Sequence, residues 1–310
     1  MKVLVTGGFG YLGSALAQLL KNEGFDVRLL ARQVPEYMLD WSRGFDVRLG
    51  DIKDESSLAG CCDAVDVVVH TAAANEIICT NDELEALLVN GFGTRNIVKE
   101  AASAGVDRFI YFSTFHAYGS AAGQVITETT EPRPTHSYGL THLVGEHYTS
   151  MAAAKTEGLT ATSLRISNGY GAPVHKGVPR WTLVINDLCR MAFETGEIII
   201  KSSGKQSRDF VAIADVYQAL KIVMDRVDHD YQVYNVGGAD SRTILEIAEI
   251  VRAVFAEQYN RELPIKILGR DEPVAAPVVF EIEKLKALGY RPNNLIALEI
   301  GRILALLDAE

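Results

Sequence analysis

The stretch Thr6-Gly7-Gly8-Phe9-Gly10-Tyr11-Leu12-Gly13 follows the short apolar segment Lys2–Thr6 and leads into helical periodicity over Ser14–Glu23. Its glycines at positions 7, 10 and 13 permit a tight turn, close approach of the backbone to a pyrophosphate, and close packing of a helix on a strand. The helix N-terminus adds unpaired N–H donors and the positive end of its dipole. This strand–turn–helix context predicts a dinucleotide-binding turn in preference to a plain structural turn. The residues expected to contact the dinucleotide are Gly7, Phe9, Gly10, Tyr11, Leu12 and Gly13.

The first half of the chain alternates between strand-like and helix-like periodicity, which indicates βαβ units and a parallel sheet. Val67-Val68-Val69 and Phe109-Ile110-Tyr111-Phe112 are continuous apolar runs, typical of strands buried on both faces. The further strands expected are Asp26–Ala31, Asp46–Leu49, Val65–Thr71, Arg108–Ser113 and Thr160–Ile166, with helices at about Asp82–Ala104 and Ser137–Glu157. The sequence therefore predicts an α/β fold with a doubly wound parallel sheet of the Rossmann type.

The regularity weakens after about Arg165, where glycine and proline mark several loops. Two later segments still fit the sheet domain, namely Phe210–Met224 and an apolar strand at Val233–Val236. We therefore predict that residues 1–166 and about 208–237 form the dinucleotide-binding domain. Residues of about 167–207 and 238–310 are expected to form a smaller, discontinuous substrate-binding lobe.

Composition narrows the class of protein. The formal net charge of −10 over 310 residues argues against nucleic acid as the main partner. A hydrophobic fraction of 48% is ordinary for a globular protein, and no membrane-spanning run is visible. The four cysteines (Cys61, Cys62, Cys79 and Cys189) lack metal-ligand spacing, so we expect no metal and buried thiols. Because the first strand begins at Lys2, we expect no signal peptide and a cytoplasmic protein.

The GxxGxxG spacing preceded by Thr resembles the extended short-chain dehydrogenase/reductase family, whose members include nucleotide-sugar epimerases, dehydratases and reductases. The resemblance extends over nearly the whole chain and includes Asp51-Ile52, His70-Thr71-Ala72-Ala73, Asn90, Ser113-Thr114, Tyr118-Gly119 and Tyr138-Gly139. It implies dinucleotide contacts for Asp51 and Ile52 near the adenine, and for Thr71, Ala72, Ala73 and Asn90. It also implies a homodimer in which the helices near Asp82–Ala104 and Ser137–Glu157 pair across a two-fold axis.

The second predicted strand ends in Leu30-Ala31-Arg32. An NAD enzyme usually places an acidic residue there, which accepts hydrogen bonds from the ribose hydroxyls. The acid is missing and the guanidinium of Arg32 suits a 2′-phosphate, although Arg32 also fits a solvated strand end. We therefore expect NADP as the cofactor, with NAD as the alternative.

The family resemblance implies a catalytic Tyr and Lys four residues apart on one helix, so that both side chains share a face. Tyr138 takes the tyrosine position, which implies proton transfer at a substrate oxygen while the nicotinamide transfers hydride. The lysine position holds His142, a departure from the family pattern. An imidazole can hydrogen-bond a ribose hydroxyl, but when uncharged it does less to stabilise tyrosinate. Two interpretations follow: a working site with histidine, or a site that has lost its chemistry.

Thr114 is the third catalytic residue that the resemblance implies, with its hydroxyl near the reacting oxygen. It also fits a strand-end threonine that satisfies backbone groups. Family dehydratases follow this Thr with an Asp-Glu pair, which supplies the acid and base for elimination of water. Phe115-His116 stands there in this chain, so 4,6-dehydratase chemistry is disfavoured.

The segment Ser203–Val211 resembles the one that nucleotide-sugar members use near the substrate diphosphate. Arg208 is the predicted diphosphate ligand because a guanidinium binds phosphate oxygens in a forked geometry, although an ion pair with a nearby aspartate is the alternative. Asn168 matches the family Asn that contacts substrate phosphate or sugar. Arg270 is a second candidate cation.

The leading hypothesis is an NAD(P)-dependent oxidoreductase or epimerase that acts on a nucleotide sugar, leaning to a keto-sugar reductase because of Arg32. The alternative is a non-catalytic dinucleotide-binding sensor with a degenerate Tyr138/His142 site. A third hypothesis keeps the fold but takes a steroid or flavonoid-like ketone. The segment Lys205–Val211 argues against it, because such substrates need no diphosphate clamp. Fold alone does not decide among these functions.

Overall fold

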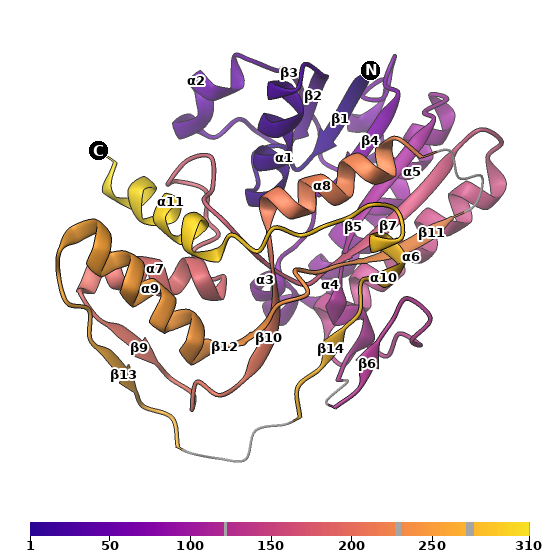
Figure 1. The fold of residues 1–310 in the computed structure, drawn as a ribbon. Helices are drawn as coiled ribbons and strands as arrows, with labels where there is room; N and C mark the ends of the chain where they lie inside the picture. Colours follow the sequence, from indigo (N-terminus) through magenta and orange to yellow (C-terminus); the bar gives the residue numbers. More distant parts are fainter. Residues whose placement is uncertain (121–122, 227–230, 271–275, 310) are drawn as a thin grey trace.

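The computed structural model describes residues 1–120, 123–226, 231–270 and 276–309. Within these ranges its centre is a seven-stranded sheet with the order β11-β7-β5-β4-β1-β2-β3, and all neighbouring strands run parallel (Figure 1). The strands are β1 (Lys2–Thr6), β2 (Asp26–Ala31), β3 (Asp46–Leu49), β4 (Val67–His70), β5 (Arg108–Thr114), β7 (Thr160–Ile166) and β11 (Gln232–Val236). The chain proceeds outward from β1 in both directions, so the predicted doubly wound sheet is confirmed.

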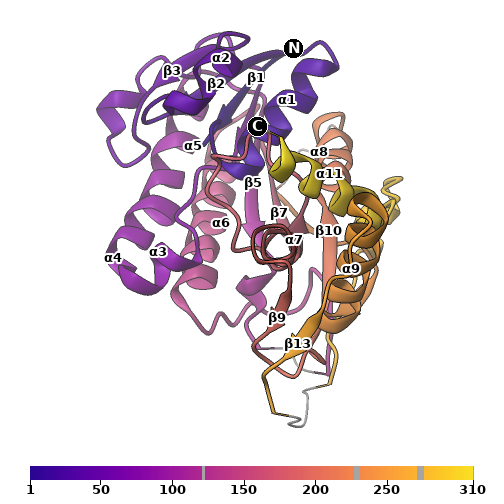
Figure 2. The same ribbon diagram turned by 90° about the vertical axis from the view of Figure 1, so that its left-hand side faces the viewer.

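Helices cover both faces of this sheet (Figure 2). On β1, Val3 and Val5 belong to the apolar cluster that contains the buried side of α1 (Tyr11–Asn22) and α8 (Ile213–Met224). Leu4 points the other way, into the cluster that contains α5 (Thr94–Ser103). Successive side chains of a strand point to opposite faces, so a continuous apolar run is needed to fill both layers.

The expected helix over Asp82–Ala104 is wrong as a single element. The segment instead forms α4 (Glu83–Ala86), the π-helical turn η3 (Leu87–Gly93) and α5, and a further helix, α3 (Glu76–Asn81), precedes it. Asp82 is extended, and its side chain accepts a hydrogen bond from the Glu85 N–H, which begins a new helix there. The helix after the glycine turn also begins earlier than expected, at Tyr11, because Gly10 takes the position before its first turn.

The C-terminal half builds a second apolar cluster beside the sheet. Its elements are β8 (Asn168–Tyr170), α7 (Val184–Thr195), β9 (Ile198–Ile200), β10 (Ser207–Ala212), β12 (Ser241–Thr243), α9 (Ile244–Tyr259), β13 (Ile265–Ile267) and α11 (Ile296–Asp308). Strands β12, β10 and β8 form a small sheet, and β13 pairs with β9. In the sequence between β10 and β12, α8 packs against α1 and β11 joins the main sheet. The domain boundaries drawn from the sequence stay a prediction.

The long helix α6 (Ser137–Lys155) packs against β5 and β7 of the main sheet. The remaining elements are short and lie in connections. They are η1 (Glu36–Met38), α2 (Leu39–Ser42), η2 (Glu55–Leu58), η4 (Phe115–Tyr118), β6 (Val125–Ile126), β14 (Val279–Phe280) and α10 (Glu283–Lys286). All four cysteines are described, and each is a buried free thiol. In the described ranges, no helix has the length and apolar character needed to cross a membrane.

Candidate active site

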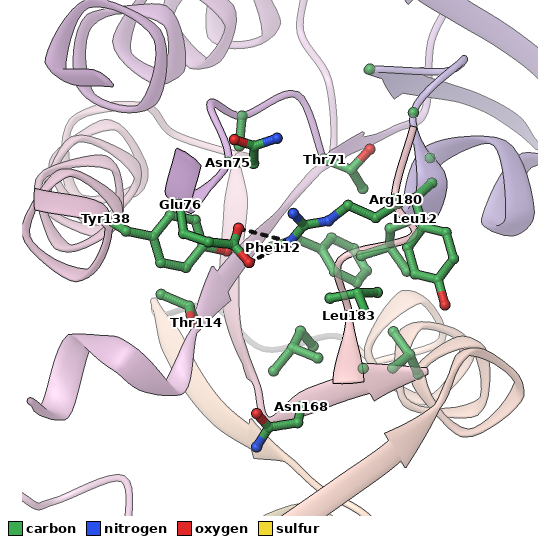
Figure 3. Close-up of a pocket in the computed structure, with 18 of the residues that line it drawn as sticks. Leu12, Thr71, Asn75, Glu76, Phe112, Thr114, Tyr138, Asn168, Arg180 and Leu183 are labelled. Atoms are coloured by element: carbon green, nitrogen blue, oxygen red, sulfur yellow. Dashed lines mark hydrogen bonds and ion pairs between the residues drawn. The ribbon is translucent and has the colours of Figure 1, made fainter. Parts of the chain in front are cut away.

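A pocket of about 530 Å³ lies at the carboxyl ends of the central strands, between the sheet and the C-terminal lobe (Figure 3). The sheet order diverges there, between β1 and β4. This topological switch point is where open α/β sheets bind ligands. The glycine turn after β1, the loop after β4, the end of β5 and the first turns of α6 all contribute to its wall.

The glycine turn has the geometry that its sequence predicts. Gly7 has a φ of 66°, which is unfavourable for residues with a side chain. A Cβ on Gly13 would lie 2.3 Å from the Gly7 carbonyl oxygen, so α1 packs on the turn only without a side chain there. Gly10 precedes α1 without a side-chain hydrogen bond, so no side chain caps the N–H groups of the first turn.

Most of the predicted site residues line this pocket. They are Gly7, Gly10, Tyr11, Leu12, Gly13, Arg32, Thr71, Ala73, Thr114, Tyr138, His142, Asn168 and Arg208. The predicted residues outside its lining are Phe9, Asp51, Ile52, Ala72, Asn90 and Arg270. Phe9 and Ile52 pack in apolar clusters, and Arg270 is exposed beyond β13. The structure does not bring Arg270 to the pocket, and its role in substrate binding stays a prediction.

Asn90 supports the pocket from behind. It is fully buried in η3, where its Oδ1 accepts a hydrogen bond from the Ala74 N–H at 2.7 Å. Its Nδ2 donates to the Thr141 hydroxyl at 3.0 Å, which ties the loop after β4 to α6. His70 has a similar supporting role, because its two ring nitrogens lie within hydrogen-bond distance of the Thr6 and Thr94 hydroxyls. Burial lowers the pKa of His70 to about 3.

Tyr138 and His142 lie one turn apart on α6, and their rings meet edge to face with centroids 4.7 Å apart. The Nδ1 of His142 lies 2.9 Å from the buried hydroxyl of Tyr111 on β5. Its Nε2 has no hydrogen-bond partner in the part of the chain that the structure describes. Burial, with the nearby His116 ring, lowers the pKa of His142 to about 3, so the imidazole is neutral at pH 7.

The electrostatic environment of Tyr138 favours its protonated form. Burial raises the pKa of Tyr138 to about 12, and the carboxylate of Glu76 contributes in the same direction. Arg180 and the Thr114 hydroxyl act in the opposite direction. Tyr138 is therefore a neutral phenol at pH 7, able to donate a proton into the pocket.

Glu76 and Arg180 are site residues that the sequence reasoning missed. Glu76 is the first residue of α3, directly after Asn75, whose side chain caps that helix. Arg180 lies in the segment before α7, and its Nη2 is 2.9 Å from one Glu76 oxygen. Figure 3 shows the pair beside Tyr138. The two residues are 104 positions apart, so no local motif marks the pair.

The C-terminal lobe contributes polar groups to the opposite wall. Asn168 donates from Nδ2 to the Asp209 carbonyl oxygen at 2.8 Å, which fixes it between β8 and β10. Arg208 lines the pocket and donates to Gln206 at 3.1 Å, and none of the ion pairs found between described residues includes it. The Tyr11 hydroxyl donates to the Gly171 carbonyl oxygen at 2.8 Å, which links the glycine turn to the lobe.

Comparison with protein families gives a match over residues 3–237 to the NAD dependent epimerase/dehydratase family. The chain belongs to this family. The resemblance drawn from the sequence motifs is thereby confirmed. The family is NAD-dependent, so the match supports NAD, the alternative cofactor, and gives no support to the expected NADP. The family match does not bear on His142, which takes the position where the resemblance implies a lysine.

Relatives within this family align with almost the full length of the chain. The UDP-glucose 4-epimerase of Corynebacterium glutamicum is 28% identical and the alignment covers 95% of this chain and 92% of that protein. The dTDP-L-rhamnose 4-epimerase of Burkholderia thailandensis is 25% identical, over 97% and 93%. The UDP-glucose 4-epimerase of Thermotoga maritima, solved with UDP-glucose, shares the fold with a TM-score of 0.85 at 24% identity over 99% of both chains.

A second solved structure, MoeE5 in complex with UDP-glucuronic acid and NAD, has a TM-score of 0.80 at 25% identity over 99% of both chains.

The residues that line the pocket of the present chain fit a nicotinamide dinucleotide. A Cβ on Gly7 would lie 2.9 Å from the Ala72 Cα, so the turn packs on the loop after β4 only without a side chain there. The unpartnered Nε2 of His142 is a polar atom that a bound ribose would satisfy. Among the described residues, no cluster suited to a metal ion is found.

Proposed function

We propose that this protein transfers hydride between a nicotinamide dinucleotide and a ring carbon of a nucleotide sugar, with Tyr138 moving the proton at the sugar oxygen. The observation that carries the proposal is that the Gly7–Gly13 turn, Tyr138 and Arg208 line one pocket. When bound, the nicotinamide supplies or accepts the hydride at its C4 carbon. Thr114, at the end of β5, is the neighbouring hydroxyl that orients the same sugar oxygen.

The nucleotide-sugar substrate is supported by the lobe side of the pocket. Arg208 offers a guanidinium that suits a diphosphate, and Asn168 offers an amide fixed by the β10 backbone. The relatives named above act on UDP- and dTDP-sugars, and the alignments cover more than 90% of this chain. A local cation in the wall also offsets the formal charge of −10, which would otherwise repel an anionic substrate.

We propose reduction of a keto sugar as the direction of the reaction. Reduction needs a proton donor, and Tyr138, with its pKa raised to about 12, holds its proton at pH 7. Arg32 lines the pocket at the end of β2 and supports NADP, the usual cofactor of reductions. Epimerisation through a keto intermediate is the second candidate, supported by the 4-epimerase relatives. It requires a Tyr138 that also accepts a proton.

The experiment begins with the purified protein, which is denatured so that any released dinucleotide can be identified by mass spectrometry. UDP- and dTDP-sugars and their 4-keto forms are then assayed with NADPH and NADH. Stoichiometric loss of NADPH indicates a reductase, whereas turnover without net cofactor loss indicates an epimerase. A protein that binds a dinucleotide but turns over no nucleotide sugar would instead be the non-catalytic sensor.

The role of Tyr138 is tested by Tyr138→Phe, which we expect to lower kcat by about 10²–10⁴-fold and leave dinucleotide affinity unchanged. Tyr148→Phe is the matched control, because it removes a phenol from the same helix outside the pocket lining. Retained turnover in Tyr138→Phe would remove this residue from the mechanism. His142→Lys restores the lysine that the family resemblance implies. We expect this variant to turn over the nucleotide sugar faster if the protein is an enzyme, and to show no turnover if the protein is a sensor.

We further propose a homodimer through α4, η3 and α6. Large apolar side chains are exposed on these neighbouring elements, at Leu84, Leu88, Phe92 and Leu140. A group of exposed apolar residues on adjacent helices marks an interaction surface. Sedimentation of the wild-type protein tests the proposal, and Leu88→Glu with Phe92→Glu is expected to give monomers.

A further inference from the structure

The hydrogen bond between Tyr111 and His142 lies directly behind the pocket wall. Tyr111 is 1% exposed on β5 and His142 is 3% exposed on α6. The phenol oxygen and the His142 Nδ1 are 2.9 Å apart. His142 itself lines the pocket, and its other nitrogen, Nε2, is buried and without a partner among the described residues. One edge of the imidazole is thus held by protein, and the opposite edge is left for a ligand.

A neutral imidazole carries one N–H proton, and the position of that proton decides what Nε2 can do. If the Tyr111 hydroxyl donates to Nδ1, the proton is on Nε2, which becomes a hydrogen-bond donor. If Nδ1 donates to Tyr111, the 2.9 Å contact is kept and the phenol proton turns to the His142 carbonyl oxygen at 3.4 Å or to the Thr94 hydroxyl. Donation to Nδ1 gives the phenol proton the nearer of its two acceptors on His142, so the Nε2–H tautomer is the one we expect.

We propose that Tyr111 is a positioning residue that holds His142 in the Nε2–H tautomer, so that Nε2 donates a hydrogen bond to a ribose hydroxyl of the dinucleotide. This inference rests on the dinucleotide site of the proposed function. It explains how an imidazole can perform the hydrogen-bonding part of the role of a lysine without its charge. The second nitrogen of a ligating histidine is commonly fixed in this way, because the partner of one ring nitrogen determines the proton on the other.

The neutral state of the ring supports the inference. Burial lowers the pKa of His142 to about 3, so the imidazole gains no proton between pH 5 and 8. A donor that depends on protonation would appear only in acid, whereas a fixed tautomer donates at all of these pH values. We therefore expect that protonation of His142 does not change the dinucleotide Kd between pH 5 and 8.

The first measurement is the tautomer itself, from the ring ¹⁵N chemical shifts of histidine-labelled wild-type protein without added dinucleotide. A protonated Nε2 and an unprotonated Nδ1 at His142 are expected at pH 7. The reverse assignment would overturn the inference. Because this measurement needs neither turnover nor bound dinucleotide, it remains decisive even where the proposed function fails.

The second measurement compares dinucleotide Kd values. Tyr111→Phe removes only the phenol oxygen, and we expect about tenfold weaker binding with a mixture of tautomers. Tyr231→Phe is the matched control, because its half-buried hydroxyl donates to the Ser163 hydroxyl at 2.8 Å, away from the pocket lining. We expect its affinity to stay within twofold of wild type.

The double variant separates positioning from a general structural effect. His142→Gln places an amide N–H donor in the same wall, and an amide has no tautomers to fix. Adding Tyr111→Phe to His142→Gln is expected to change dinucleotide affinity by less than twofold. An equal loss of affinity in the histidine and glutamine backgrounds would show that Tyr111 does not act through His142. A wild-type protein that binds no dinucleotide would contradict the proposed function instead.

Discussion

The Glu76 carboxylate and the Arg180 guanidinium are paired across the pocket, with oxygen–nitrogen distances of 2.9 and 3.1 Å (Figure 3). Glu76 begins α3, next to the sheet, whereas Arg180 approaches from the segment before α7. The pair therefore connects the two walls of the site. Both residues also influence Tyr138, the carboxylate by raising its pKa and the guanidinium by lowering it.

The substitution Glu76→Gln should lower the pKa of Tyr138. A nearby carboxylate disfavours the phenolate, so its removal favours ionisation, and Arg180 keeps its charge without a partner. We expect the alkaline limb of the kcat profile for keto-sugar reduction to move down by about one pH unit, because the proton donor is lost at a lower pH. Stopped-flow rates between pH 9 and 12 measure this limb.

Arg180→Gln provides the opposite test. Without the guanidinium, the phenolate loses a favourable charge, so the same limb should move to higher pH or leave the measurable range. Identical profiles for wild type and both variants would show that the ion pair does not control Tyr138. Dinucleotide affinity serves as the control readout, since neither residue belongs to the glycine turn.

Arg208→Ala should raise the KM for a nucleotide sugar by about 10–100-fold, with a smaller effect on kcat. A guanidinium–phosphate contact is a charge-assisted hydrogen bond of about 1.5–3 kcal/mol, and the diphosphate is remote from the reacting carbon. Arg270→Ala is the matched control, since Arg270 is exposed and outside the pocket lining. A larger KM effect at Arg270 than at Arg208 would reverse this assignment of the diphosphate site.

Arg32→Ala should weaken NADPH binding by about tenfold and change NADH binding by less than twofold. The 2′-phosphate is the group that distinguishes the two cofactors, and a single guanidinium contact to it accounts for this factor. Titration followed by nicotinamide fluorescence gives both Kd values. Wild-type protein that binds NADH more tightly than NADPH would refute the expected preference for NADP.

The parts of the fold that the sequence predicts are those with a local cause. The boundaries of β1, β2, β3 and β7 follow from short apolar runs that end at turn residues, and they agree with the expected ranges. The helix expected from Asp82 does begin there, as α4, but the sequence missed α3 before it and the π-helical turn η3 between α4 and α5. Asn90 in η3 bonds to the Ala74 N–H and the Thr141 hydroxyl, and these contacts depend on the tertiary fold.

The same distinction applies to the site. Tyr138 and His142 share one helix face, so their spacing alone brings them together. Tyr111 lies in an apolar run that reads as core, and its hydroxyl reaches His142 only once α6 packs on β5. Arg180 comes from a loop region without periodicity. Pairing across such distances depends on the tertiary fold, which residue spacing does not encode.

A buried ion pair between α6 and β7 allows a prediction about stability. Glu146, one turn beyond His142, accepts hydrogen bonds from Arg165 at 2.9 and 2.6 Å and from the Ser113 hydroxyl at 2.5 Å. The two charged side chains are 4% and 5% exposed. The network joins α6 to β5 and β7, and thereby fixes the helix that carries Tyr138.

Glu146→Gln should lower the free energy of unfolding by about 3–5 kcal/mol, because Arg165 is left buried without a counter-charge. Urea denaturation followed by circular dichroism measures this change. Glu131→Gln is the control, because its pair with Arg133 is exposed and should contribute less than about 1 kcal/mol. The double substitution of Glu146→Leu with Arg165→Met should recover much of the loss, because it removes both buried charges together. If Glu146→Gln alone were as stable as wild type, the pair would have no role in fixing α6, and the alignment of Tyr138 would need another cause.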